Sequence, residues 1–254
     1  IKFYISDMTE SNYFKFSNSV IVFPMLAVLS IWTVYWFEIR FQVNFNDYGV
    51  YPRTLKGLRG IFLSPFIHSS VDHLYNNTIP IAILTASLTY FYRNIAIKVL
   101  LWGILLSGVI TWLIGRPSYH IGASGLIYVL VSFIFFKGII SKHYRLVALS
   151  LMVVFIYGSL LWYIFPVEDG ISWEGHLGGF VTGLFLAFAM KVPLPILKKY
   201  DWEKEDYNEE DDEFLKHFDE HGNFIESKPP VQEDDDIIIK YHFKKGSGEG
   251  KEDH

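Results

Sequence analysis

The sequence contains no cysteine and has few charged residues. Its 254 residues are 51% hydrophobic and 19% charged, whereas a typical globular domain has about 25% charged residues. Without cysteine the chain can form no disulfide, thiolate metal site or iron–sulfur cluster, and it has no cysteine nucleophile. The shortage of charge argues against a soluble globular enzyme, because a soluble surface of this size needs more charged side chains to cover it.

The charge is also divided unequally along the chain. Residues 201–254 hold 19 of the 27 Asp and Glu residues but only 7 of the 22 Lys and Arg residues, a net charge of −12. Residues 1–200 have a net charge of +7. The acidic part contains runs of Asp and Glu and predicts a solvated, largely disordered tail. Its pattern permits a short strand at 237–243.

Six stretches have the apolar character of transmembrane helices, which need about 20 predominantly apolar residues. We expect these spans at 20–39, 72–92, 95–114, 124–136, 144–165 and 173–190. They predict an all-α polytopic membrane protein, a six-transmembrane-helix bundle over 20–190 between a cytosolic segment (1–19) and a cytosolic acidic tail (191–254). The first loop, 40–71, is apolar for a connection, so we expect it in the membrane interface or against the bundle.

The positions of Lys and Arg predict the orientation, because cytoplasmic connections are rich in both. Six spans put both termini on one side, which receives ten Lys and Arg residues against five on the other. This bias predicts an N-in, C-in arrangement, and the short termini and lack of a transit segment favour a bacterial inner membrane. The ten are Lys2, Lys15, Arg93, Lys98, Lys137, Lys142, Arg145, Lys191, Lys198 and Lys199.

Polar residues inside spans are costly and mark candidate functional sites. They occur here in three motifs near the outer ends of spans, HSSVDHLYNN (68–77), GASGLIY (122–128) and GHLGGFVTG (175–183). Because these ends lie on one side of the membrane, we expect the motifs to form one cluster. Each motif alone also fits ordinary helix packing, in which Gly and Ser are common.

A serine with a nearby histidine indicates nucleophilic catalysis. A serine hydroxyl becomes a good nucleophile when a base within about 3 Å removes its proton, and histidine is the usual base. We therefore interpret Ser124 as the nucleophile and His176 as its base. Ser124 begins a helix, where free N–H groups and the positive dipole end can stabilise an oxyanion. No suitable third carboxylate is found, so the sequence favours a dyad.

The neighbouring residues suggest how such a site is completed. His73 and Asn77, spaced i, i+4, lie on one helix face and would donate to the oxyanion. Tyr128, one turn after Ser124, would support the imidazole ring. Gly122 and Gly125 allow close approach, and Gly175, Gly179 and Gly183 form GxxxG steps that favour tight packing. His68 is interpreted as a structural residue of the first loop, and His120 and His143 as interfacial loop residues.

Taken in order, the three motifs resemble the rhomboid family of intramembrane serine proteases, and the resemblance covers about residues 20–190. It implies a catalytic dyad of Ser124 and His176, with His73 and Asn77 joining the serine N–H in an oxyanion hole.

The resemblance also implies that Tyr128 stacks on the catalytic histidine and that His68 orders the structure. The sequence departs from many bacterial members in two places. Its first loop has no Trp-Arg pair, and Gly175 stands where Ala often precedes the histidine.

The predicted function is therefore hydrolysis of transmembrane helices of single-span substrates within the lipid bilayer, without a cofactor and without a nucleic-acid partner. The alternative is a non-catalytic rhomboid-like protein that binds client helices, which the intact dyad disfavours. A small transporter is disfavoured because paired broken helices and a buried charge chain are absent. A zinc protease would need an HExxH motif and an aspartyl protease two mid-span Asp residues, and the sequence has neither.

Overall fold

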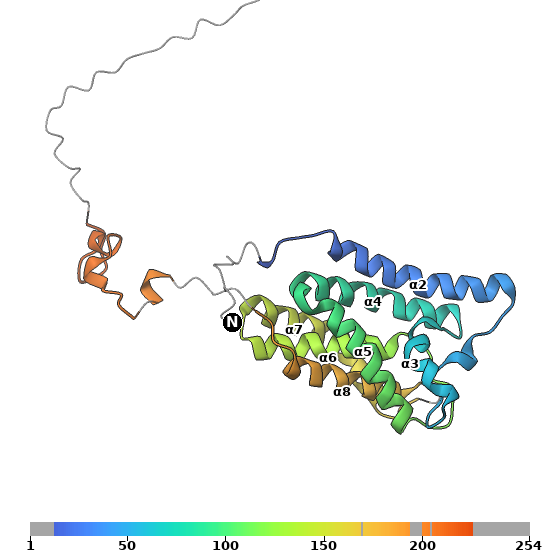
Figure 1. The fold of residues 1–254 in the computed structure, drawn as a ribbon. Coiled ribbons are helices and arrows are strands. Elements are labelled where there is room, and N and C mark those ends of the chain that lie inside the picture. The colour runs from blue at the N-terminus through green and yellow to red at the C-terminus, as the bar shows by residue number, and fades with distance from the viewer. Residues whose placement is uncertain (1–12, 169, 194–199, 204, 226–254) are drawn as a thin grey trace, which may run out of the picture. The chain divides into compact units, whose positions relative to one another are not determined.

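A computed structural model describes residues 13–168, 170–193, 200–203 and 205–225. The described chain is helical (Figure 1), with β pairing limited to isolated bridges, and it divides into two compact units, Ile1–Leu197 and Lys198–His254. The all-α class is therefore confirmed. The long helices are α2 (Ser19–Phe41), α4 (Val71–Phe91), α5 (Arg93–Ile114), α6 (Ser124–Ser141), α7 (Tyr144–Tyr157) and α8 (Trp173–Ala189).

Four segments of the described chain are long and apolar enough to cross a membrane. They are α2, α5, α6 and the stretch from Tyr144 to Ile164, which joins α7 to the 3-10 helix η4 (Gly158–Ile164). Two further long helices do not meet this criterion. Helix α8 has 17 residues, and α4 begins with the polar sequence VDHLYNN. The four segments support a polytopic membrane bundle, and the count of six spans stays a prediction.

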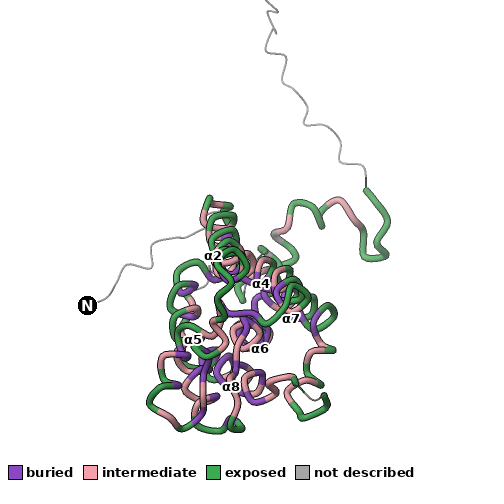
Figure 2. The backbone as a smooth tube through the Cα atoms, turned by 90° about the vertical axis from the view of Figure 1, so that its right-hand side faces the viewer, coloured by how far each residue is buried: buried purple, intermediate pink, exposed green. Residues whose placement is uncertain are grey.

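Helix α6 is the central element of the first unit. Of its most apolar stretch 61% is buried, against 28% for α5 and 11% for α2. Figure 2 shows buried residues gathered around α6, between α4, α5, α7 and α8. Leu130, Phe133 and Ile134 of α6 are fully buried. The outer faces of the other helices are apolar and exposed, as expected where lipid surrounds a bundle.

The fourth predicted span ends too early. The sequence suggested a helix to residue 136 with Lys137 in a cytoplasmic connection, whereas α6 continues to Ser141 and buries Lys137. The Lys137 ammonium donates to the carbonyl of Ala187, 3.0 Å away at the end of α8. A cation is favoured at a helix C-terminus, where carbonyls lack intrahelical partners. Without Lys137, nine Lys and Arg residues remain on the predicted cytoplasmic side, which is still more than the five on the other side.

Glycines bring the backbones of α6 and α8 into contact. A Cβ on Gly179 would lie 2.2 Å from the carbonyl oxygen of Gly125, and one on Gly183 would lie 2.3 Å from that of Val129. Gly125 itself is less constrained, since a Cβ there would lie 3.5 Å from the carbonyl oxygen of Gly175. The backbones of the two helices are thus closest at Gly179 and Gly183, and they lie farther apart at Gly175 and Gly125.

The apolar first loop packs against the bundle, which was one of the two positions predicted for it. It contains the short helix α3 (Gly60–Leu63), whose Ile61 lies so close to α5 that a Cβ on Gly108 would be 3.0 Å from the Ile61 Cα. Val50 forms an antiparallel bridge with His120, with both N–H···O distances at 2.9 Å. The loop therefore supports the chain that leads from α5 into α6.

In the second unit, described residues of the acidic tail form short turns. They include the 3-10 helices η5 (Asp201–Glu203), η6 (Glu209–Asp211) and η7 (Leu215–His217). A bridge between Phe218 and Phe224 closes a turn whose Asp219 carboxylate accepts from the Asn223 N–H at 2.8 Å. The strand suggested at 237–243 lies outside the described residues.

The contact between α6 and α8 leads to a stability prediction. Gly179→Ala would push a methyl group into the Gly125 carbonyl, and forced overpacking of this kind costs about 1–3 kcal/mol. Gly125→Ala on the facing helix is the matched control, because its methyl would make an ordinary contact at 3.5 Å. We expect thermal unfolding in detergent to show a lower midpoint for Gly179→Ala only. Equal loss in both variants would contradict the assigned packing.

Candidate active site

Ser124 and His176 are brought together by the first turns of α6 and α8. Ser124 is the first residue of α6, and His176 is the fourth residue of α8 and only 7% exposed. The Ser124 Oγ lies 2.9 Å from the His176 Nε2. The two residues proposed as a dyad are therefore in hydrogen-bond contact, as a nucleophile and its general base must be.

The tautomer of His176 follows from its second hydrogen bond. Its Nδ1 lies 2.9 Å from the backbone carbonyl oxygen of Tyr163. Because a carbonyl only accepts, Nδ1 carries the proton in the neutral ring and Nε2 is left to accept from the Ser124 hydroxyl. The sequence offered no suitable carboxylate for this role, and it could not indicate the carbonyl. The carbonyl belongs to η4, and no residue type marks its position.

Tyr128 stacks on the imidazole ring of His176. The two ring centroids are 4.2 Å apart and the planes differ by 10°. The Tyr128 hydroxyl donates to the carbonyl of Leu160 at 2.6 Å. The helix η4 thus holds both rings through backbone carbonyls, that of Tyr163 for the histidine and that of Leu160 for the tyrosine.

His73 and Asn77 on α4 face the residue two positions before Ser124. A Cβ on Gly122 would lie 2.6 Å from the His73 Nε2 and 3.8 Å from the Asn77 Nδ2. Gly122 also has φ +105°, a conformation that L side chains rarely adopt. Two features therefore require glycine at this position. One is the backbone angle, and the other is the small space beside the two polar side chains. One Asn77 N–H donates to the His73 carbonyl at 2.9 Å.

His68 lies behind the serine rather than at it. It is 2% exposed, and its Nε2 lies 3.4 Å from the backbone N of Ala123, the residue before Ser124. Its Nδ1 lies 3.4 Å from the Phe66 carbonyl. With a carbonyl at Nδ1 and an N–H at Nε2, the neutral ring fits both partners. Burial, together with a smaller effect of the neighbouring His73, lowers the pKa of His68 to about 4.

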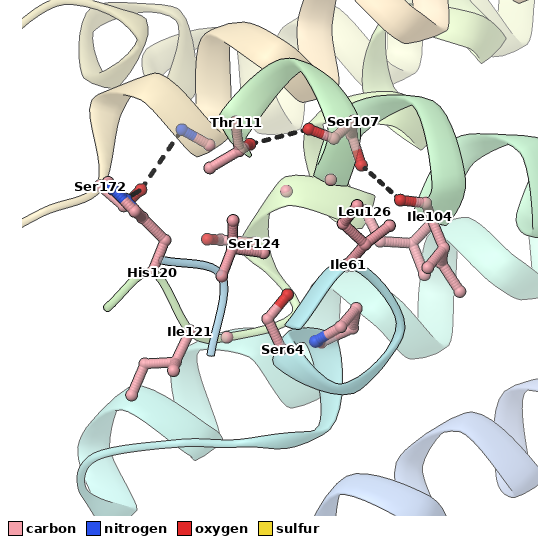
Figure 3. Close-up of a pocket in the computed structure, with 16 residues that line it drawn as sticks. Ile61, Ser64, Ile104, Ser107, Thr111, His120, Ile121, Ser124, Leu126 and Ser172 are labelled. Carbon is pink, nitrogen blue, oxygen red and sulfur yellow. Dashed lines mark hydrogen bonds between the residues drawn. The ribbon is translucent and has the colours of Figure 1, made fainter. Parts of the chain in front are cut away.

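Two cavities meet at Ser124. The larger has a volume of about 760 Å³ and is lined by His73, Asn77, Tyr128 and His176, with Leu160 and Tyr163 of η4 on another side. The smaller, drawn in Figure 3, has a volume of about 30 Å³ and is lined by the hydroxyl residues Ser64, Ser107, Thr111 and Ser172. A polar cavity of this size can hold a water molecule.

Comparison with known proteins identifies the family. A family model described as Rhomboid domain matches residues 56–192, more than half of the chain. The chain belongs to the rhomboid family. The matched range includes every residue of the candidate site, from His68 to His176 and Gly179, and it supports an integral membrane protein together with the four apolar segments.

Similar proteins occur in mycobacteria. An uncharacterized protein of Mycobacterium bovis and one of Mycobacterium tuberculosis are each 35% identical over 165 residues, which cover 61% of this chain and 66% of the relative. An uncharacterized protein of Mycobacterium leprae is 34% identical over 148 residues, 54% of this chain and 57% of the relative. The matches thus span less than two thirds of the length of these relatives.

The buried His68 gives a pH prediction. In the folded protein the pKa of His68 lies below its ordinary value of 6.5. Between pH 6.5 and 4 the His68 side chain is therefore protonated in the unfolded chain and neutral in the folded chain. The free energy of unfolding therefore falls as the pH falls through this window, by at most about 3 kcal/mol from His68.

The test compares the parent with His68→Leu by thermal unfolding at pH 7 and pH 4. We expect the variant to be less stable at pH 7 and the difference to narrow at pH 4. His221→Gln, on an exposed turn of the tail, is the control and should follow the parent at both values. A difference that does not depend on pH would contradict the assignment.

Proposed function

We propose that this chain is an intramembrane serine endopeptidase that cleaves transmembrane helices of single-span membrane proteins through an acyl-enzyme. The observation that carries the proposal is the 2.9 Å contact between the Ser124 Oγ and the His176 Nε2. The Tyr163 carbonyl supports it, because it leaves Nε2 unprotonated and ready to accept the serine proton. Ser–His pairs of this geometry are able to activate a serine for acyl transfer.

The reaction has two halves. In the first, the Ser124 Oγ attacks the carbonyl carbon of the scissile bond while its proton moves to the His176 Nε2. The tetrahedral intermediate collapses, the C–N bond breaks, and the proton passes from Nε2 to the leaving amine. In the second half, water attacks the ester on Ser124, with Nε2 again taking and returning a proton, which releases the new carboxyl terminus.

The developing oxyanion needs donors that are already in position. The Ser124 N–H is in the first turn of α6, where backbone donors lack intrahelical acceptors and the helix dipole favours negative charge. We place the oxyanion in the space beside Gly122, where the His73 Nε2 and the Asn77 Nδ2 are the nearest side-chain groups. The donors would then come from two sides, α4 and the start of α6.

The larger cavity is the proposed place for the substrate. Its walls come from α4 on one side and η4 on the other, and Ser124 lies between them. A helix resists attack because its carbonyls are bonded within the helix, so substrates with helix-breaking or polar residues near the cut are expected. The smaller cavity, which shares Ser124, Ile121 and Ser172 with the larger one, is suited to holding the hydrolytic water.

We further propose six spans with both termini in the cytoplasm, which adds α4 and α8 to the four apolar segments. Helix α4 falls below the criterion of apolarity because it begins with the polar residues of the site, and α8 falls below the criterion of length with 17 residues. The mycobacterial relatives support a bacterial inner membrane. A non-catalytic helix-binding protein is the competing function and is tested by the same experiment.

The dyad is tested by purifying the parent, Ser124→Ala and His176→Ala in mild detergent. Each is incubated with a tagged single-span helix that contains a small residue and a nearby helix breaker, and in parallel with a fluorophosphonate probe. We expect cleavage and labelling of the parent and loss of both, by at least about 10³-fold, in the two variants. No labelling of a folded parent would reject the protease and favour helix binding.

The oxyanion donors are tested by Asn77→Ala, with Asn76→Ala as the matched control. Asn76 is the adjacent residue on α4 and lines the same cavity, but it is not one of the groups beside Gly122. Removing one oxyanion donor typically lowers kcat about 10²- to 10³-fold. We expect that loss for Asn77→Ala in the same cleavage assay and a change below about threefold for Asn76→Ala. Equal losses would remove Asn77 from the oxyanion site.

A further inference from the structure

His120 is buried in the connection between α5 and α6, four residues before Ser124. The sequence suggested an interfacial loop residue, and His120 does lie in a loop, but its side chain is buried with only 4% exposed. Its backbone is held by the first loop, through the bridge with Val50. Its side chain points away from that bridge toward Ser172 (Figure 3), the residue that caps α8.

The hydrogen bonds of His120 form a chain with a fixed direction. Its Nε2 lies 3.1 Å from the carbonyl oxygen of Arg116, which only accepts, so Nε2 carries the proton. Its Nδ1 therefore accepts, and it lies 2.5 Å from the Ser172 Oγ. The Ser172 Oγ in turn accepts from the N–H of Gly175 at 3.3 Å. Each proton has one place in this chain, and no acceptor is left without a donor.

The chain joins the two segments that carry the dyad at matching positions. The bond between His120 and Ser172 lies four residues before Ser124 on one segment and four residues before His176 on the other. Both bonds link residues 52 positions apart. In addition, the His176 N–H donates to the Ser172 carbonyl at 3.2 Å. A shift at Ser172 is therefore transmitted directly to the backbone of the catalytic histidine.

An ion pair holds the same two segments on another side. The Glu174 carboxylate accepts from the backbone N–H of Arg116 at 3.1 Å and lies 3.6 Å from the Arg116 Nε. The Arg116 guanidinium also donates to the Ile171 carbonyl. This second link means that loss of the His120 side chain should loosen the junction without separating the two segments.

We propose that His120 is a positioning residue of this enzyme, and that its imidazole, held between the Arg116 carbonyl and the Ser172 hydroxyl, sets the separation of Ser124 from His176. The inference rests on the proposed protease function. Its physical basis is that a catalytic pair tolerates little misplacement, since an error of about 1 Å can lower a rate by about 10²-fold.

The test uses the full chain with His120→Phe, which keeps a ring of similar size and loses both hydrogen bonds. We expect kcat for the single-span helix to fall about 10- to 100-fold while KM changes by less than about twofold, because His120 does not line the larger cavity. The rate of fluorophosphonate labelling should fall with kcat. His143→Phe, which removes a buried histidine before α7, is the control and should keep the parent kcat.

A double variant separates positioning from simple loss of stability. Ser172→Ala breaks the same chain at its other end, so it should also lower kcat. If the two residues act through one link, the effects of their substitutions should not add, because interacting residues are non-additive. The double variant His120→Phe, Ser172→Ala should then have a kcat within about twofold of that of the less active single variant. Effects that multiply would overturn the proposal.

Other outcomes are equally decisive. A parent-like kcat in His120→Phe, with only a lower unfolding midpoint, would assign His120 to packing and overturn the proposal. A higher KM at unchanged kcat would move it to substrate binding and overturn it as well. A folded parent that neither cleaves nor labels would reject the protease function itself, and the positioning role with it.

Discussion

The contact between the backbones of α6 and α8 is the constraint on which the site depends. Gly179 and Gly183 let the two helices approach until a single added carbon would collide with the Gly125 and Val129 carbonyls. In lipid no hydrophobic force drives helices together, and small residues allow the van der Waals contact that does. The first turns of both helices are held together as a result, and Ser124 and His176 come within hydrogen-bond distance.

The histidine is oriented by a backbone carbonyl in place of a carboxylate. An ionised carboxylate buried in an apolar bundle costs several kcal/mol in desolvation, whereas a carbonyl of η4 fixes the same tautomer with no net charge. The cost is that the carbonyl must come from a turn that departs from α-helical geometry. Helix η4 meets this need, because its 3-10 turns present the carbonyls of Leu160 and Tyr163 to Tyr128 and His176.

The sequence predicted those parts of the molecule that depend on residue type. Ser124, His176, His73 and Asn77 are costly in a membrane, so their presence near span ends was informative, and the structure brings them to one place. The Tyr163 carbonyl could not be predicted, since every residue has a carbonyl and only the turn after α7 selects this one.

Two other features were hidden for a different reason, because their meaning depends on distant partners. Lys137 was predicted to lie beyond the end of a span, but α6 continues through it to Ser141, and its ammonium donates to a carbonyl near the end of α8. His120 read as a loop residue near solvent, yet Val50 pairs with its backbone and Ser172 with its ring. All these partners lie at least 50 positions away in the sequence, beyond the reach of local patterns.

The apolar first loop follows from the same logic. Ser124, His73 and His176 lie in the first turns of α6, α4 and α8, where irregular chain leads into each helix. Irregular backbone at membrane depth must be covered by protein, since exposed N–H and C=O groups cannot be satisfied by lipid. The loop covers it with apolar side chains such as Ile61 and with backbone bonds, as between the Gly122 N–H and the Ser64 carbonyl at 2.9 Å. A polar site within a bundle thus requires a connection that covers it, and this explains why the first loop is unusually apolar.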